Sequence, residues 1–200
     1  MLFEVQNLQG RHVPEVSFAL GGGEVLTVQG ESGVGKSQML RALADLSPHE
    51  GEVRLNGRAQ HGMPATEWRR QVVLVPAESG WWAETVAAHF AQRPSDDWWE
   101  RLRLRPDLWE APVERLSSGE RQRLAVLRAL VLAPRVLLLD EPTANLDREN
   151  ASAMAALLLE YVREHEAAAV WISHNPEEVR GHSSRWLEMT TEGGRLHEPV

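Results

Sequence analysis

The chain has 200 residues, of which 42% are hydrophobic, so it can form one domain with a substantial core but not two full-sized domains. It contains no cysteine, which excludes disulfides and thiolate metal sites, and its formal charge of -8 argues against a nucleic-acid partner bound by phosphate neutralisation. No apolar stretch reaches the roughly 18 residues that span a bilayer, and residues 1–4 lack the features of a signal peptide, so we expect a cytoplasmic protein.

The N-terminal third predicts a small antiparallel sheet beside a strand, a loop and a helix. Three short runs predict the strands of this sheet: Phe3–Asn7, Val16–Leu20 and Gly51–Leu55. The last run leads into Asn56-Gly57, a typical hairpin turn. An apolar strand over Val25–Val28 is followed by a glycine-rich loop and a helix over Gln38–Leu46, which should stop at Ser47-Pro48.

The glycine-rich loop holds the only lysine of the chain and matches the phosphate-binding pattern G-x-x-x-x-G-K-[ST]. Its backbone N–H groups and the positive end of the following helix suit β- and γ-phosphates. A lysine bridges the oxygens of these phosphates, and the hydroxyl that follows it is a ligand for Mg²⁺. The candidate nucleotide-binding residues are Gly30, Glu31, Ser32, Gly33, Val34, Gly35, Lys36, Ser37 and Gln38, with Ser37 also the candidate metal ligand.

The rest of the chain predicts apolar strands that alternate with amphipathic helices. A buried strand over Val72–Val75 precedes a tryptophan-rich stretch, which we interpret as part of a compact helical insertion over about residues 78–132. The later elements are a helix, a strand, a second helix and a second strand: Glu120–Leu132, Val136–Leu139, Arg148–His165 and Ala168–Ile172. This alternation is typical of an α/β fold with a largely parallel sheet covered on both faces.

Asp140 and Glu141 follow an apolar strand, at the edge where ligands bind in open α/β sheets. Beside a phosphate loop, this pair indicates one carboxylate, Asp140, that holds Mg²⁺ and a second, Glu141, that orients and polarises the attacking water. Without that loop, the same two acids would indicate only the start of a solvated turn.

The segment Ser117-Ser118-Gly119-Glu120, here called the signature segment, precedes a predicted helix. It satisfies the S-x-x-E capping box, which is worth about 1 kcal/mol. A helix N-terminus with exposed N–H groups also binds anions, so these residues are candidates for contacting the γ-phosphate held by another subunit. Both interpretations require the same geometry.

Five motifs in a fixed order make the chain resemble the ATP-binding cassette (ABC) ATPases: GESGVGKS, LSSGERQRLAVLRAL, VLLLDEP, TANLD and WISH. The resemblance covers nearly the whole chain and implies a single ABC ATP-binding domain over residues 1–200. The implied fold is that of a P-loop NTPase, with a RecA-like core sheet, a small antiparallel β-subdomain and a short α-helical insertion. The implied cofactors are ATP and Mg²⁺.

The resemblance also implies a mechanism. Two protomers, identical or paralogous, would form a head-to-tail dimer that closes on two ATP molecules, each held between one phosphate loop and the signature segment of the other protomer. Asp147 would lie in the loop between protomers. His174 would be the switch histidine and would act in catalysis with Glu141, because a histidine can hydrogen-bond both γ-phosphate and water.

The chain departs from the family pattern at three places. Ala77 stands where the family has a glutamine that senses Mg²⁺ and the membrane partner; alanine can do neither, and Glu78 would substitute only if the loop shifted by one residue. In the signature segment, Ser118 and Glu120 replace the usual glycine and glutamine. No adenine-stacking aromatic is evident near the N-terminus, where His12 is the nearest candidate and is equally well a surface-loop histidine.

The resemblance is greatest to small ATPase subunits that pair with a separate integral membrane protein, particularly those attributed to iron or metal export. This implies a location at the inner face of the cell membrane. Trp81 and Trp82 follow the loop beside which a membrane subunit docks in this family, so they are either interface anchors or part of the packing of the insertion. The alternative function is a non-transport ABC ATPase that acts as an ATP-gated clamp on protein or nucleic acid.

Overall fold

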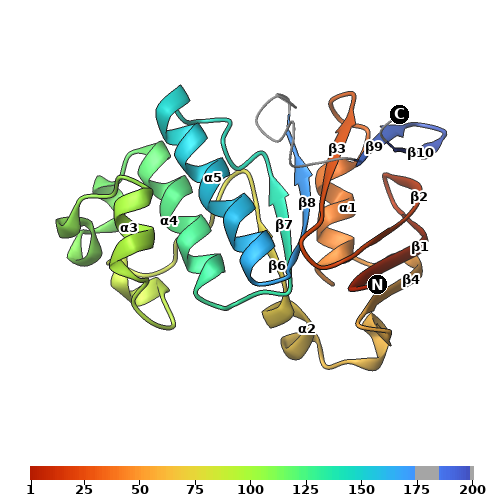
Figure 1. Ribbon diagram of the computed structural model, residues 1–200, viewed down its shortest axis with the longest axis horizontal. Coiled ribbons are helices and arrows are strands. Elements are labelled where there is room, and N and C mark those ends of the chain that lie inside the picture. The colour runs from red at the N-terminus through yellow and green to blue at the C-terminus, as the bar shows by residue number, and fades with distance from the viewer. Residues whose placement is uncertain (174–184, 199–200) are drawn as a thin grey trace.

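Two β-sheets with helices packed on them make up the fold, which a computed structural model describes for residues 1–173 and 185–198 (Figure 1). The smaller sheet is antiparallel and has the order β2-β1-β4-β5, with β1 (Phe3–Gly10), β2 (Val13–Leu20), β4 (Glu50–Leu55) and β5 (Arg58–Ala59). This sheet confirms the antiparallel subdomain that the sequence predicts.

The larger sheet has the order β10-β9-β3-β8-β7-β6 and is parallel from β9 to β6. Its strands are β3 (Val25–Gly30), β6 (Val72–Val75), β7 (Val136–Asp140), β8 (Ala168–Ile172), β9 (Arg185–Thr190) and the antiparallel edge strand β10 (Gly193–His197). The predicted α/β class with a mostly parallel core sheet is confirmed.

The helices cover both faces of this core sheet. They are α1 (Lys36–Leu43), α2 (Ala65–Gln71), α3 (Asp96–Arg101), α4 (Ser118–Leu130) and α5 (Arg148–Glu164), with single turns of 3₁₀-helix between some of them. Figure 1 shows α3 and α4 at one end of the molecule and the antiparallel sheet at the opposite end. In the described part of the chain, no helix is both long and apolar enough to cross a membrane.

The central strands of the core sheet, β7 and β8, are buried at every position because they are almost uninterrupted apolar runs covered on both faces. In β7, Val136 and Leu138 join the cluster formed with α1 and the antiparallel sheet, whereas Leu137 and Leu139 join the cluster formed with α4 and α5. Helices α1 and α4 therefore lie on opposite faces of the sheet. This placement matters for the site, because each of these helices begins at one of the predicted phosphate-binding segments.

The structure corrects several predicted boundaries. Helix α1 ends at Leu43 rather than Leu46, because Asp45 adopts the left-handed conformation (φ 58°) that terminates helices. Helix α4 begins at Ser118, two residues before the predicted start, because Ser117 caps it. The short helix α2 and the hairpin of β9 and β10 were not predicted.

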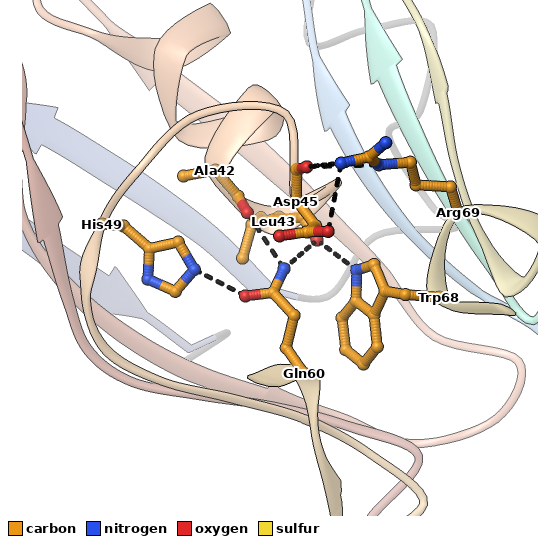
Figure 2. A network of polar contacts seen from close by, with 7 residues as sticks. All are labelled: Ala42, Leu43, Asp45, His49, Gln60, Trp68 and Arg69. Carbon is orange, nitrogen blue, oxygen red and sulfur yellow. Dashed lines mark hydrogen bonds and ion pairs between the residues drawn. The ribbon is translucent and has the colours of Figure 1, made fainter. Parts of the chain in front are cut away.

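Side chains from the segment after β5 hold the C-terminal end of α1 (Figure 2). The buried Gln60 side chain donates from Nε2 to the carbonyls of Ala42 and Leu43, both at 3.1 Å, and its Oε1 contacts Nε2 of His49. The indole of Trp68 donates to the same Leu43 carbonyl at 2.9 Å. These bonds supply donors for the last carbonyls of the helix, which have no partner within it.

Candidate functional site

The phosphate loop joins the end of β3 to the start of α1, so it lies at the carboxyl edge of the parallel sheet. The Lys36 side chain is buried, and its ammonium donates to the carbonyls of Gly30 at 2.7 Å and Glu31 at 2.9 Å. Lys36 is also the first residue of α1, whose N-terminal N–H groups and dipole favour anions. The loop thus brings a cation and the positive end of a helix to one place.

Two glycines allow neighbouring backbone to approach this loop. Gly35 has φ 108°, and a Cβ there would lie 2.0 Å from the carbonyl oxygen of His12. Gly30 has φ 146°, and a Cβ there would lie 2.3 Å from the carbonyl oxygen of Met189. The β1–β2 turn and strand β9 therefore fix the position of the loop, and no side chain fits at either glycine.

The contact at Gly35 also places His12 beside the phosphate loop. His12 is exposed and, together with Gln38 of α1, lines a cavity of about 900 Å³ between the β1–β2 turn and residues 47–50. A cavity of this size can hold a small-molecule ligand. The sequence indicated His12 only by its position, and the structure places it beside the phosphate loop, in the lining of this cavity.

Asp140 and Glu141 stand at the end of β7, on the same sheet edge as the phosphate loop. Burial raises the pKa of Asp140, as does the neighbouring Glu141 charge, while a hydrogen bond from Ser37 and the charge of Lys36 oppose this rise. Glu141 has a left-handed backbone (φ 49°), and its N–H donates to the carbonyl of Ile172 at 3.0 Å. A non-glycine residue in this conformation costs about 1–3 kcal/mol, a strain that is common at functional sites.

The signature segment forms the N-terminus of α4 with the capping box that the sequence predicts. The Ser117 hydroxyl accepts from the Glu120 N–H, and the Glu120 carboxylate accepts from both the N–H and the hydroxyl of Ser117. Partial burial would raise the pKa of Glu120, but the hydrogen bonds from Ser117 and the nearby Arg105 and Arg123 lower it overall. Ser117 and Ser118 are exposed, so this helix start is accessible to a ligand.

Asp147 lies close to the signature segment, as the N-cap of α5. Its Oδ1 accepts from the N–H of Asn150 at 2.9 Å, and bonds from Asn150 lower the pKa of Asp147. Asp147 and Glu120 both line a cavity of about 630 Å³ that also contains Arg103, Arg123 and neighbouring charged residues. The structure therefore brings Asp147 and the signature segment together.

The predicted site residues thus form two groups. The first contains the phosphate loop, Asp140, Glu141 and His12, and the second contains the signature segment and Asp147. The phosphate loop of the first group leads into α1, and the signature segment of the second group forms the start of α4. These two helices cover opposite faces of the core sheet. His174 lies outside the described residues.

The family model described as "ABC transporter" matches residues 13–144 of this chain. The chain belongs to the ABC transporter family. The probable iron export ATP-binding protein FetA of Escherichia coli K12 is 28% identical over 98% of this chain and 95% of its own length. The lipoprotein-releasing system ATP-binding protein LolD of Maricaulis maris is 34% identical over 86% of this chain and 82% of its own length.

Solved ABC structures share the fold. The ATP-binding cassette MJ0796, in a dimeric post-hydrolysis state with ADP and Pi, superimposes with a TM-score of 0.81 at 21% identity, over 100% of this chain and 99% of its own. A bacterial Atm1-family ABC exporter with ATP bound gives a TM-score of 0.84 at 22% identity, over 98% of this chain and 38% of its own. Family membership and these relatives establish this ABC protein as an ATP-binding subunit with ATPase activity.

Sequence reasoning missed two residues that link parts of this ABC site, Arg123 and Asn150. Arg123 lies four residues after Gly119 on α4, a spacing that places both on one face of the helix. That spacing was the only available signal, because the other partners of Arg123 come from α5 and from the end of α3.

Proposed function

We propose that this ABC ATPase works as a head-to-tail dimer that powers a separate integral membrane subunit. The placement of the two site groups on opposite faces of the core sheet carries this proposal. A single chain offers the phosphate loop on one face and the signature helix on the other, so two chains are needed to enclose one nucleotide between them. In such a dimer, Ser117, Ser118 and Gly119 of one protomer face the γ-phosphate held by its partner.

Within one site, Lys36 and the N-terminus of α1 bind the phosphates, and a carboxylate and a hydroxyl are suited to Mg²⁺. Ser37 and Asp140 are already hydrogen-bonded, and hard oxygen donors of this kind fit that ion. No cluster of three or more His, Cys, Asp or Glu side chains that could hold a metal occurs in the described residues. That finding suits Mg²⁺, which is usually held by one or two protein oxygens and by substrate phosphates. The ion would neutralise charge that develops on the phosphates.

Glu141 is the proposed general base, because it follows Asp140 directly at the sheet edge and orients the water that attacks the γ-phosphate. Replacement of Glu141 by glutamine keeps the shape of the side chain and removes its basicity. We expect Glu141→Gln to bind ATP normally, to lose turnover and to accumulate as an ATP-bound dimer in sedimentation experiments. Rapid turnover by this variant would contradict the assignment.

Trp82 is the proposed anchor for the membrane subunit. Its side chain is 73% exposed, while Trp81 packs against the cluster of α4 and α5. The guanidinium of Arg128 lies over both indoles, 4.8 Å from the Trp81 ring and 4.9 Å from the Trp82 ring. The ring of His89 packs edge-on against the same two indoles. An exposed indole held in a fixed orientation is well suited to an interface.

We expect Trp82→Ala to release the membrane subunit while leaving ATP affinity unchanged, because the indole does not contact the phosphate loop. Co-purification and nucleotide titration measure the two properties separately. Loss of both together would show that Trp82 is needed for the fold rather than for docking.

The proposed cargo is iron or another metal ion, moved out of the cell. FetA, which is named as a probable iron export protein, is similar over almost the full length of both chains. Metal uptake into inverted vesicles that contain the subunit and its membrane partner tests this cargo. ATP-dependent accumulation of iron is expected, and accumulation of a lipoprotein instead would contradict it.

A further inference from the structure

The Arg123 side chain joins three segments that are distant in the sequence. Its Nε donates to the carbonyl of Gly119 in the signature segment at 3.2 Å. Its Nη1 donates to the carbonyl of Leu102, just after α3, at 3.0 Å and to Oδ1 of Asn150 on α5 at 2.7 Å. Burial lowers the pKa of Arg123, against the charges of Glu120 and Asp147 that act to raise it. One planar guanidinium therefore bridges α4, the end of α3 and α5 with donors in a fixed planar arrangement that a lysine ammonium lacks.

Asn150 extends this link to Asp147. The Asn150 Nδ2 donates to Oδ2 of Asp147 at 2.6 Å, and the Asn150 backbone N–H donates to Oδ1 of Asp147 at 2.9 Å. The amide can face in one direction only, because its oxygen must accept from Arg123 and its nitrogen must donate to Asp147. The result is a directed chain of hydrogen bonds from Arg123 through Asn150 to Asp147.

Packing also connects the signature segment to the loop that carries Asp147. A Cβ at Gly119 would lie 3.2 Å from Cδ2 of Leu146, which immediately precedes Asp147, so the signature segment and the Asp147 loop are already in close contact. A contact and a hydrogen-bond chain that connect the same pair of segments restrict their relative movement. Gly119 and Asp147 are thereby held at a fixed separation on one surface.

We propose that Arg123 is a positioning residue that, through Asn150, sets the spacing between the signature segment and Asp147, so that both meet the partner protomer together. This inference rests on the proposed head-to-tail dimer. Arg123 belongs to α4, on the face of the core sheet opposite α1 and its phosphate loop, so its effect should appear in the association of protomers. A displacement of about 1 Å in groups that must engage together can cost on the order of a hundredfold in rate.

The test uses two conservative variants in the Glu141→Gln background. Arg123→Lys keeps the positive charge and removes the planar fork. Asn150→Asp keeps an acceptor for Arg123 but removes the side-chain donor to Asp147 and places two carboxylates side by side. Arg101→Lys is the matched control, because Arg101 bridges α3 to Glu160 of α5 at 2.8–3.0 Å without reaching the signature segment or Asp147.

Sedimentation with ATP and Mg²⁺ measures dimer formation, and calorimetric titration of the monomer measures ATP affinity. We expect Arg123→Lys and Asn150→Asp each to weaken dimer formation at least about tenfold with unchanged ATP affinity, and Arg101→Lys to leave both unchanged. The double variant should be no weaker than the worse single variant, because both substitutions break one chain. Wild-type dimer formation by Arg123→Lys and Asn150→Asp, or additive losses in the double variant, would overturn the inference.

Two further outcomes separate this inference from the proposed function. If Glu141→Gln alone forms no dimer with ATP, the proposed dimer is wrong and the inference fails with it. The other outcome is that Glu141→Gln is the only variant that dimerises, with Arg123→Lys, Asn150→Asp and the control Arg101→Lys all losing dimer formation equally. In that case the junction between α3 and α5 acts only as a structural support. That result also overturns the specific role of Arg123.

Discussion

Replacement of Gln60 by leucine tests how strongly the end of the phosphate-loop helix is held. The Gln60 side chain is 6% exposed and gives two hydrogen bonds, to the carbonyls of Ala42 and Leu43, while it accepts one from His49 (Figure 2). Leucine has a similar volume but makes none of these bonds. The substitution therefore removes polar contacts without leaving a large cavity.

The expected loss follows from the bonds and from what replaces them. Each intramolecular hydrogen bond contributes roughly 0.5–1.5 kcal/mol net. The carbonyl of Leu43 still accepts from Trp68, and that of Ala42 still accepts from the N–H of Asp45, so neither oxygen is left without a partner. Burial of the leucine side chain offsets part of the loss. We expect a decrease of about 2 kcal/mol in the free energy of unfolding, or a melting temperature lower by roughly 4–8 °C.

Urea denaturation of the nucleotide-free protein measures this difference. Gln71→Leu is the control, because the partly buried Gln71 side chain makes a single bond, to the carbonyl of Glu67, at 3.5 Å. This bond is at the limit of hydrogen-bond length, so the control should change the unfolding free energy by less than about 0.5 kcal/mol. Equal effects of the two substitutions would refute the reasoning.

Three further predictions concern other parts of the chain. Gly35→Ala should abolish ATP binding, and it should lower the melting temperature more than Gly57→Ala does. The reason is that a Cβ would meet the His12 carbonyl at Gly35 but open space at Gly57. Equal shifts in melting temperature for the two variants would contradict this. Glu120→Gln keeps an acceptor for Ser117 and removes only the negative charge at the start of α4, which should cost roughly 0.3–1 kcal/mol at pH 7. Since the folded pKa of Glu120 is lowered, this cost should vanish as pH falls from 4.5 through that pKa, and a pH-independent cost would contradict it. Tyr161 is the only tyrosine, and burial raises its pKa to about 12. Ultraviolet titration of the folded protein should give that midpoint, and the free energy of unfolding should fall as pH rises above 10. A midpoint near 10 would be inconsistent with the burial of this side chain.

The sequence predicted the elements whose own residues determine them. Strands β6 and β8 have the predicted bounds, because both are uninterrupted apolar runs that end at a break in the pattern. The Asn56-Gly57 turn also occurs as predicted, since both residues adopt the positive φ values of a tight hairpin, 50° and 75°. The phosphate loop and the capping box of α4 are likewise local features and could be identified from residue spacing.

Elements that depend on distant partners could not be predicted in this way. Strand β9 pairs with β3 far away in the sequence, and its alternation of Trp186, Leu187 and Glu188 is too short to identify it alone. The two tryptophans after β6 have different exposures because Trp81 finds partners in the α4–α5 cluster and Trp82 does not. The link from Arg123 to Asp147 depends on tertiary packing in the same way.

The central claim is that this ABC ATPase serves a membrane subunit. It is tested most directly by affinity purification of the tagged protein from native membranes in mild detergent with ATP, followed by mass spectrometry, with Trp82→Ala as the matched control. The account predicts that a membrane protein with several spans accompanies the wild-type chain in stoichiometric amount and is lost from the Trp82→Ala sample. Recovery of only soluble proteins or nucleic acid with the wild-type chain would contradict the claim and favour an ATP-gated clamp.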